Sequence, residues 1–246
     1  MLSDGDWERL SQLMQDTGRV YNKPEHRSTL EGILYRMRTG CPWRDLPEAF
    51  GHWNTVFRRF NLWSRKGVMT RIFKVLSFDT DTEWLFIDSS IVRAHQHSSG
   101  ARGRTEQAIG RSHGGRSTKI HLAVDSYGLP VHYELSAGQV HDMSHARSLI
   151  DGSPPADNVI ADKGYDSGAV REHIEARGGV SVIPRRKNRA LGNETMDWCL
   201  YRYRHLVENA FSRIKHFRAI ATRYDKLERN FASMLARAFV VAWLPM

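Results

Sequence analysis

The sequence has few cysteines, fewer acidic than basic residues and no long hydrophobic stretch. Its two cysteines, Cys41 and Cys199, exclude a disulfide framework and a four-cysteine zinc site. The 27 acidic residues are outnumbered by 36 lysines and arginines, which gives a net charge of +9. This excess makes polyanions attractive partners, and acidic proteins and anionic membrane surfaces are alternative partners of a basic protein.

Two kinds of targeting segment are also missing. The first ten residues, MLSDGDWERL, carry Asp4, Asp6 and Glu8 where a signal peptide needs an apolar core. The apolar run AFVVAWLPM near the other end is far shorter than the ~20 residues that span a bilayer. We therefore expect a cytoplasmic protein without a membrane partner.

Residues 1–75 have the pattern of an all-helical domain. HRSTLEGILYRMRTG (26–40) has apolar residues at helical spacing and ends at Gly40. After the turn CPWRDLP, a second helix with an aromatic stripe carries Arg58 and Arg59 off that stripe. The pair resembles a helix-turn-helix DNA-binding domain, and a plain helical packing domain fits the pattern equally well.

Residues 80–246 predict a second domain of α/β class. Short apolar runs bounded by turn residues predict five strands, at 84–92, 118–126, 130–138, 157–165 and 179–184. The turn DSYGLP predicts a hairpin between the second and third of them. Helical patterns fall at about 142–151, 167–177, 198–219 and 227–243. This order predicts a mixed five-stranded sheet flanked by helices.

Two basic segments suit contact with DNA phosphates. Residues 95–119 form a polar, glycine-rich stretch too long for a quiet loop, and RRKNR (185–189) follows a predicted strand. The candidate phosphate contacts in these segments are Arg102, Arg104, Arg111, Arg116, Lys119, Arg185, Arg186 and Lys187. His95 and His97 could bind a metal, but no further ligands follow at zinc-like spacing.

Two aspartates follow apolar strands. Asp88 comes after WLFI and Asp162 after NVIA. A charged carboxylate there costs several kcal/mol unless it is paired, hydrogen-bonded or bound to a metal. Taken singly, each is also explained as a strand-end residue that makes a turn or caps a helix.

The helix near the C-terminus, YRYRHLVENAFSRIKHFR (201–218), places one carboxylate among many cations. At ~100° per residue, Tyr201, Arg204, Glu208 and Lys215 share an arc of about 60°, apart from the apolar face. This suits an acid that holds a divalent metal beside groups that hold phosphates. An amphipathic helix with a basic polar side is the alternative.

Three carboxylates from two strands and a helix are what an oxygen-liganded Mg²⁺ site would use. Two such ions, with Mn²⁺ able to substitute, would stabilise the attacking and leaving oxygens of a phosphodiester displacement. We therefore expect Asp88, Asp162 and Glu208 to act as metal ligands and catalytic residues.

Several blocks of the chain resemble the DDE transposases of bacterial insertion sequences, of the IS-five type. The resemblance rests first on the spacing Y-(2)-R-(3)-E-(6)-K, which Tyr201, Arg204, Glu208 and Lys215 fill. It rests also on sequence blocks that follow one another in the order GILYRMRTGCPWRDLPEAFGHW, FIDSSIVRAHQH, GRSHGGRSTKIHLAVDSYGLP, GQVHD and ADKGYDS. The resemblance implies an RNase H-like catalytic domain in which Asp88, Asp162 and Glu208 are the catalytic acids. It implies further that Tyr201, Arg204 and Lys215 hold terminal DNA phosphates.

The predicted function is a transposase that cleaves element ends at terminal inverted repeats and joins them to target DNA, with a homodimer pairing the ends. A transposase-derived DNA-binding regulator without catalysis and a general metal-dependent nuclease are the alternatives.

Other residues near these motifs have other expected roles. We expect Asp125 in a hairpin turn and Asp142 at a helix start. Asp166 is expected to cap a helix, and it is the candidate that would replace Asp162 if Asp162 is not part of the site. Trp198 is a weak candidate for stacking on a flipped base.

Overall fold

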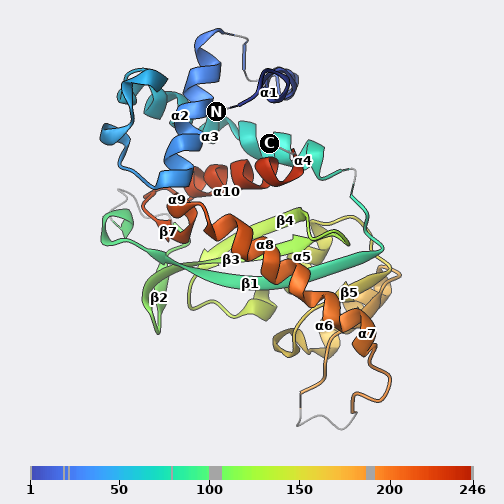
Figure 1. Ribbon diagram of the computed structural model, residues 1–246. Coiled ribbons are helices and arrows are strands. Elements are labelled where there is room, and N and C mark those ends of the chain that lie inside the picture. The colour runs from blue at the N-terminus through green and yellow to red at the C-terminus, as the bar shows by residue number, and fades with distance from the viewer. Residues whose placement is uncertain are drawn as a thin grey trace. The chain divides into compact units, whose positions relative to one another are not determined.

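The computed structural model describes residues 2–18, 20–21, 23–78, 80–99, 107–186 and 192–244. The chain forms two compact units (Figure 1). The helical unit contains residues 1–76, 92–107 and 214–246, and the sheet unit contains residues 77–91 and 108–213. The units are therefore not consecutive along the chain, unlike the predicted domains 1–75 and 80–246.

The helical unit is built around the last helix, α10. Its helices and short elements are α1 (Asp4–Asp16), α2 (Glu25–Thr39), η1 (Trp43–Asp45), η2 (Glu48–Phe50), α3 (Trp53–Lys66), α4 (Val68–Leu76), η3 (Gln96–Ser99), α9 (Arg218–Ala221) and α10 (Glu228–Trp243). The middle of α10 is buried on nearly every side, and it packs against α3 and α4. Phe239 of α10 lies 5.2 Å from Phe73 of α4, measured between ring centroids. This apolar packing explains why the C-terminal segment belongs with the N-terminal helices.

The connection between α2 and α3 is longer than the three- or four-residue turn of a helix-turn-helix motif. Helix α2 ends at Gly40, whose φ of 70° is the left-handed conformation that glycine adopts readily. Two 3₁₀ turns, η1 and η2, follow before α3 begins at Trp53. The predicted helical region is present, with a connection that differs from the tight turn of that motif.

The sheet unit contains a mixed sheet. Its strands are β1 (Trp84–Ala94), β2 (Gly110–Ser112), β3 (Gly115–Val124), β4 (Pro130–Ala137), β5 (Asn158–Ile160) and β6 (Val180–Val182). The neighbour order is β3–β1–β5–β6, and β2 and β4 both pair with β3 in antiparallel fashion. Strands β1, β5 and β6 are parallel. All five predicted strands and the predicted hairpin are confirmed. The last residues of β1 belong to the helical unit, where they pair with β7 (Thr222–Arg223).

Helices lie on both sides of this sheet (Figure 1). They are η4 (Asp142–His145), α5 (Ala146–Asp151), η5 (Lys163–Tyr165), α6 (Gly168–Ala176), α7 (Trp198–Tyr201), η6 (Arg202–Arg204) and α8 (His205–Lys215). Leu85 and Ile87 of β1 share a buried core with residues of α5 and α6. Because side chains alternate along a strand, Phe86 and Asp88 face the opposite side. The mixed sheet flanked by helices is the predicted architecture, with β2 and β7 added to the five predicted strands.

Candidate active site

The register of two parallel strands places Asp88 and Asp162 side by side. Trp84, Leu85 and Phe86 of β1 pair with Asn158, Val159 and Ile160 of β5. Continuing that register by two residues sets Asp88 opposite Asp162. Side chains at matched positions of neighbouring strands point to the same face, so both carboxylates lie on the face away from α5 and α6.

The segment α7–η6–α8 carries the third acid. Asp197 begins it by accepting a hydrogen bond from the backbone N–H of Leu200 at 2.8 Å, a standard helix cap. Tyr203 anchors the next turn against Trp84 of β1, with the ring centroids 5.2 Å apart. This packing fixes η6 beside β1 and brings Arg204 and Glu208 to the strand that carries Asp88.

Arg204 links two of the three acids. Its Nη1 donates to Asp88 Oδ2 at 2.9 Å, and its Nη2 forms an ion pair with Glu208. Burial is the largest single influence on the pKa of Arg204 and lowers it. The charges of Asp88, Glu208, Tyr201 and Asp162 together outweigh burial and raise the pKa above its ordinary value. The guanidinium therefore lies within reach of all the acidic groups of the predicted site.

The pKa of Asp88 is raised above its ordinary value. Burial is the main cause, and the charges of Asp162 and Glu208 add to it. The backbone N–H of Ser89, which donates to Asp88 Oδ1 at 2.7 Å, and the charge of Arg204 act in the opposite direction. The three carboxylates thus repel one another across a half-buried site, and a cation stabilises them.

The donor set of this site fits a divalent, oxygen-loving ion. Three carboxylates with a mutual repulsion that raises the pKa of Asp88 are the chemistry that Mg²⁺ or Mn²⁺ compensates. Arg204 holds Asp88 and Glu208 in this structure. No three His, Cys, Asp or Glu side chains among the described residues lie close enough together to form a metal centre. A divalent ion held by these acids would compete with Arg204 for the carboxylate oxygens of Asp88 and Glu208.

A second group of polar residues, made up of Lys119, Asp142 and Tyr165, lies beside these acids. Of the three, only Lys119 was predicted to belong to the site, as a phosphate contact. Lys119 is buried, and its Nζ donates to Asp142 Oδ1 at 2.5 Å and to the Val140 carbonyl at 2.7 Å. Burial acts to raise the pKa of the Asp142 carboxyl. Hydrogen bonds from Lys119 and Ser89 act against burial, and the pKa of Asp142 lies below its ordinary value. The buried Tyr165 hydroxyl has its pKa raised, by burial first and then by Asp88, Asp142 and Asp162. The GQVHD and ADKGYDS blocks contain Asp142 and Tyr165, but their apolar or turn-like neighbours gave no sign of this arrangement.

The structure places the predicted phosphate contacts in different environments. Arg116 and Arg186 are exposed, and Arg186 donates to the carbonyls of Lys163 and Gly164 in the turn that follows Asp162. Arg185 and Tyr201 are partly exposed. Lys119 is poorly placed for a phosphate, because its side chain is buried and two of the three N–H donors of its ammonium are engaged.

The other predicted contacts lie elsewhere. Arg58 and Arg59 belong to α3 of the helical unit, and Lys215 ends α8 with its pKa lowered by burial. Arg102, Arg104 and Lys187 fall outside the described residues. Trp198 is 49% exposed and meets Tyr201 edge-on, with ring centroids 5.7 Å apart.

Two acids have structural roles. Asp125 Oδ1 accepts from the backbone N–H groups of Tyr127 and Leu129, which confirms the predicted hairpin turn. Asp166 is 2% exposed and forms an ion pair with Arg171 at 3.0 Å. Its other oxygen accepts from the backbone N–H of Arg186 at 2.9 Å. Both of its oxygens are therefore committed to holding the sheet edge.

Family models match nearly the whole chain. Residues 79–243 match the model described as "Transposase DDE domain", and residues 2–73 match "Putative transposase of IS4/5 family". Among the helices that the structure describes, none is long and apolar enough to cross a membrane.

Similar curated proteins come from several bacteria. The uncharacterized protein y4sN of Sinorhizobium fredii is 37% identical over 127 residues, which is 51% of this chain and 95% of that protein. A protein of Brucella ovis named as a transposase for insertion sequence element IS6501 is 33% identical over 132 residues, covering 52% of this chain and 98% of the relative.

Two solved structures show distant likeness. The synaptic complex of piggyBac transposase with hairpin DNA is 11% identical, with a TM-score of 0.47 over 74% of this chain. This chain spans 48% of the length of that transposase. The Mos1 transposase paired-end complex is 12% identical, with a TM-score of 0.30 over 91% of this chain and 79% of the other. Both scores are below 0.5, so family membership rests on the sequence matches.

Proposed function

The chain belongs to the DDE transposases, and on that premise we propose that it binds the terminal inverted repeats of an insertion sequence and transfers the element into target DNA. The reaction has two stages, in which water first cleaves the strand at the 3′ end of the element and the new 3′-hydroxyl then attacks a target phosphodiester. The observation that carries the proposal is the arrangement of Asp88, Asp162 and Glu208 around Arg204 in the sheet unit.

Asp88, Asp162 and Glu208 would hold Mg²⁺, with Mn²⁺ able to substitute and two ions the expected number. Bound ions supply activation of the attacking oxygen and charge stabilisation of the leaving oxygen. The aspartates are set by neighbouring strands, and the glutamate by a helix packed on one of them. Asp88 belongs to β1, Asp162 follows β5 as the cap of η5, and Glu208 belongs to α8, which supports a role in catalysis by positioning.

The cationic groups around the acids would position the DNA backbone. Arg204 donates to the carboxylates of Asp88 and Glu208, and its guanidinium would be suited to hold a DNA phosphate when DNA is bound. Tyr201 and Lys215 lie on the same helical segment, and Arg116 and Arg186 offer exposed cations in the sheet unit. Arg58 and Arg59 would contact DNA from α3. Pairing of two element ends calls for two copies of the chain, acting on nucleoid DNA in the bacterial cytoplasm.

A cleavage and joining assay tests the proposal. The substrate is a labelled duplex with the native element end, incubated with wild type, Glu208→Gln or Glu175→Gln in Mg²⁺ or Mn²⁺. Glu175 is an exposed glutamate of α6 and serves as the matched control. The proposal expects 3′-end nicking and joined products from wild type and the control, and neither from Glu208→Gln.

Three other outcomes would overturn it in distinguishable ways. Tight binding of the end without nicking in any metal would identify a regulator without catalysis. Nicking without preference for the end sequence and without joined products would identify a general nuclease. Nicking by Glu208→Gln at the wild-type rate would remove Glu208 from the site.

A further inference from the structure

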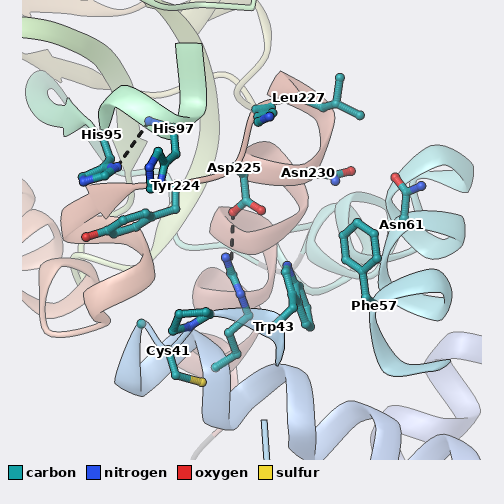
Figure 2. Close-up of a pocket in the computed structure, with 14 residues that line it drawn as sticks. Cys41, Trp43, Phe57, Asn61, His95, His97, Tyr224, Asp225, Leu227 and Asn230 are labelled. Carbon is teal, nitrogen blue, oxygen red and sulfur yellow. Dashed lines mark hydrogen bonds and ion pairs between the residues drawn. The ribbon is translucent and has the colours of Figure 1, made fainter. Parts of the chain in front are cut away.

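The helical unit contains a cavity of about 960 Å³ that the proposed chemistry does not use (Figure 2). Its walls come from four parts of that unit, namely the end of α2 with the turn after it, helix α3, the segment of His95 and His97, and the segment from Tyr224 to Asn230. The volume lies at the upper end of the 300–1,000 Å³ that is typical of small-ligand sites. It is therefore large enough for an organic ligand rather than for a single water.

Buried polar atoms in the cavity wall lack hydrogen bonds. Among the described residues, no hydrogen-bond partner is found for Arg36 Nε and Nη1, Asp225 Oδ2, Asn61 Oδ1 or Asn230 Oδ1. All four residues line the cavity. Buried polar groups are satisfied in more than 90% of cases, so a group of such atoms around one space indicates a polar occupant.

Arg36 and Asp225 are the most informative of these residues. Their side chains are each 5% exposed, and Arg36 Nη1 lies 3.7 Å from Asp225 Oδ2, which is an ion pair without a hydrogen bond. A buried pair of this kind is costly unless further hydrogen bonds satisfy it. The Arg36 guanidinium offers hydrogen-bond donors, and the neighbouring Asp225 carboxylate offers an acceptor. A ligand that carries an acceptor next to a donor would bind to both residues.

Aromatic rings form part of the wall on two sides of the cavity. The rings of Trp43 and Phe57 lie 5.4 Å apart, and the Arg36 guanidinium lies 4.4 Å from the Trp43 ring centroid. On another side, His95 stacks on Tyr224 at 4.5 Å with an interplanar angle of 24°. Figure 2 shows these rings and the two asparagine side chains around the Asp225 carboxylate. Such walls suit a planar ligand that can stack.

We propose that this cavity binds a nucleobase. Each base has a flat π-face and an edge on which acceptors lie next to donors, which matches the rings, the Arg36–Asp225 pair and the asparagine amides. The base could come from a free nucleotide or from an unpaired position in DNA. With DNA as the source, the proposal rests on the proposed function, whereas a free nucleotide would bind independently of it.

The test measures ligand binding by the full-length protein. Saturation-transfer NMR with the four deoxynucleoside monophosphates reports which ligand protons contact the protein, and titration gives the affinity. Competition then compares a fully paired duplex with the same duplex carrying one unpaired base. The variants are Asn61→Leu, which removes an unpartnered amide, and Tyr224→Ala, which removes a wall ring that is 41% exposed. Asn54→Leu on the same helix and the exposed Tyr21→Ala are the matched controls.

The expected result is saturation of the base protons and a loss of affinity of about tenfold in each cavity variant, with both controls unchanged. Preference for the unpaired duplex identifies DNA as the source, and mononucleotide binding without that preference identifies a free nucleotide. Absence of base contacts, or equal affinity in variants whose thermal melting shows them folded, would overturn the proposal. Glu208→Gln should bind bases normally, so failure here and failure of catalysis are separate results.

Discussion

Arg204 supplies the positive charge that the acids of the candidate site share. It donates to Asp88, pairs with Glu208 and lies within electrostatic reach of Asp162. A divalent ion and this guanidinium would compete for the same carboxylate oxygens. The residue thus stabilises the acids without metal and opposes metal binding until its charge moves to another partner.

Replacing this residue should separate metal binding from DNA processing. Arg204→Ala removes the competing cation, so Mn²⁺ should bind severalfold more tightly to the DNA-free protein. The same variant should join DNA ends more slowly, because a phosphate contact is lost. Electron paramagnetic resonance of free Mn²⁺ measures the first effect, with the exposed Arg202→Ala of the same turn as control. Weaker Mn²⁺ binding by Arg204→Ala would contradict this account of the residue.

A buried histidine gives the stability of the fold a predictable pH dependence. Burial, with help from the neighbouring His145, lowers the pKa of His121 to about 4. Between pH 6.5 and 4 the unfolded chain therefore takes up a proton that the folded protein does not. The unfolding free energy should fall by up to about 3 kcal/mol as the pH drops through this window.

Urea unfolding of wild type and His121→Gln across that pH range measures the effect. Gln can keep the hydrogen bond to Ser136, which His121 makes at 2.8 Å. Burial raises the pKa of Asp125 to about 6, which gives a slope of opposite sign between about pH 4 and 6. Both proteins contain Asp125, so the difference between their unfolding free energies at each pH reports the contribution of His121 alone. Parallel curves for the two proteins would show that His121 does not titrate as described.

At the scale of elements, the hairpin β3–β4 supports the helix that carries Glu208. Gly128, in the hairpin turn, has a φ of 75°, and a Cβ there would lie 3.3 Å from Leu206 Cβ and from its carbonyl oxygen. Gly178 has a similar φ of 83° but open space around it. These two glycines therefore separate backbone strain from crowding against α8.

Alanine at each glycine should have different effects. Gly178→Ala should cost about 1 kcal/mol from the left-handed conformation alone. Gly128→Ala should cost about 1 kcal/mol more, because Leu206 must shift. Urea unfolding measures the costs, and nicking activity should fall only for Gly128→Ala as α8 is displaced. Equal costs would show that the turn does not support the helix.

The elements were well predicted where local patterns decide them. Alternating apolar runs located β1, β3, β4, β5 and β6, and the 3.6-residue period located α8 and α10. The 3₁₀ turn at η6 and the short strand β2 were missed, because nothing local distinguishes them from a helix and a loop. The packing of Tyr203 on Trp84 depends on residues far apart in sequence, and no pattern predicts it.

At the scale of the whole molecule, the sequence predicted the sheet but not how the chain divides. The apolar run of α10 was visible, yet a single sequence does not show that its partners are α3 and α4 rather than the sheet. The candidate acids Asp88, Asp162 and Glu208 could be singled out in the sequence because each stands out from its local neighbours. The contact of Asp142 with Lys119 could not be predicted, because it joins residues that are far apart in sequence. Local sequence patterns do not show which residues pack against each other when those residues are far apart in the chain.

This division predicts how fragments behave. Residues 77–246 expressed alone should aggregate, because the apolar face of α10 loses its α4 partner. Co-expression with residues 1–76 should restore a soluble complex. Gel filtration and thermal melting of the two preparations measure this. A monomeric 77–246 fragment with a cooperative melt would contradict the division of the chain.

The central claim is that Asp88, Asp162 and Glu208 hold one metal site. Fe²⁺ in place of Mg²⁺, with ascorbate and peroxide, cleaves a polypeptide near the bound ion, and mass spectrometry maps the cuts. The account predicts cuts in the middle of β1, after β5 and in α8, all suppressed by excess Mg²⁺ and lost in Asp88→Asn. Cuts confined to the segment of His95 and His97, or cuts that excess Mg²⁺ leaves unchanged, would contradict it.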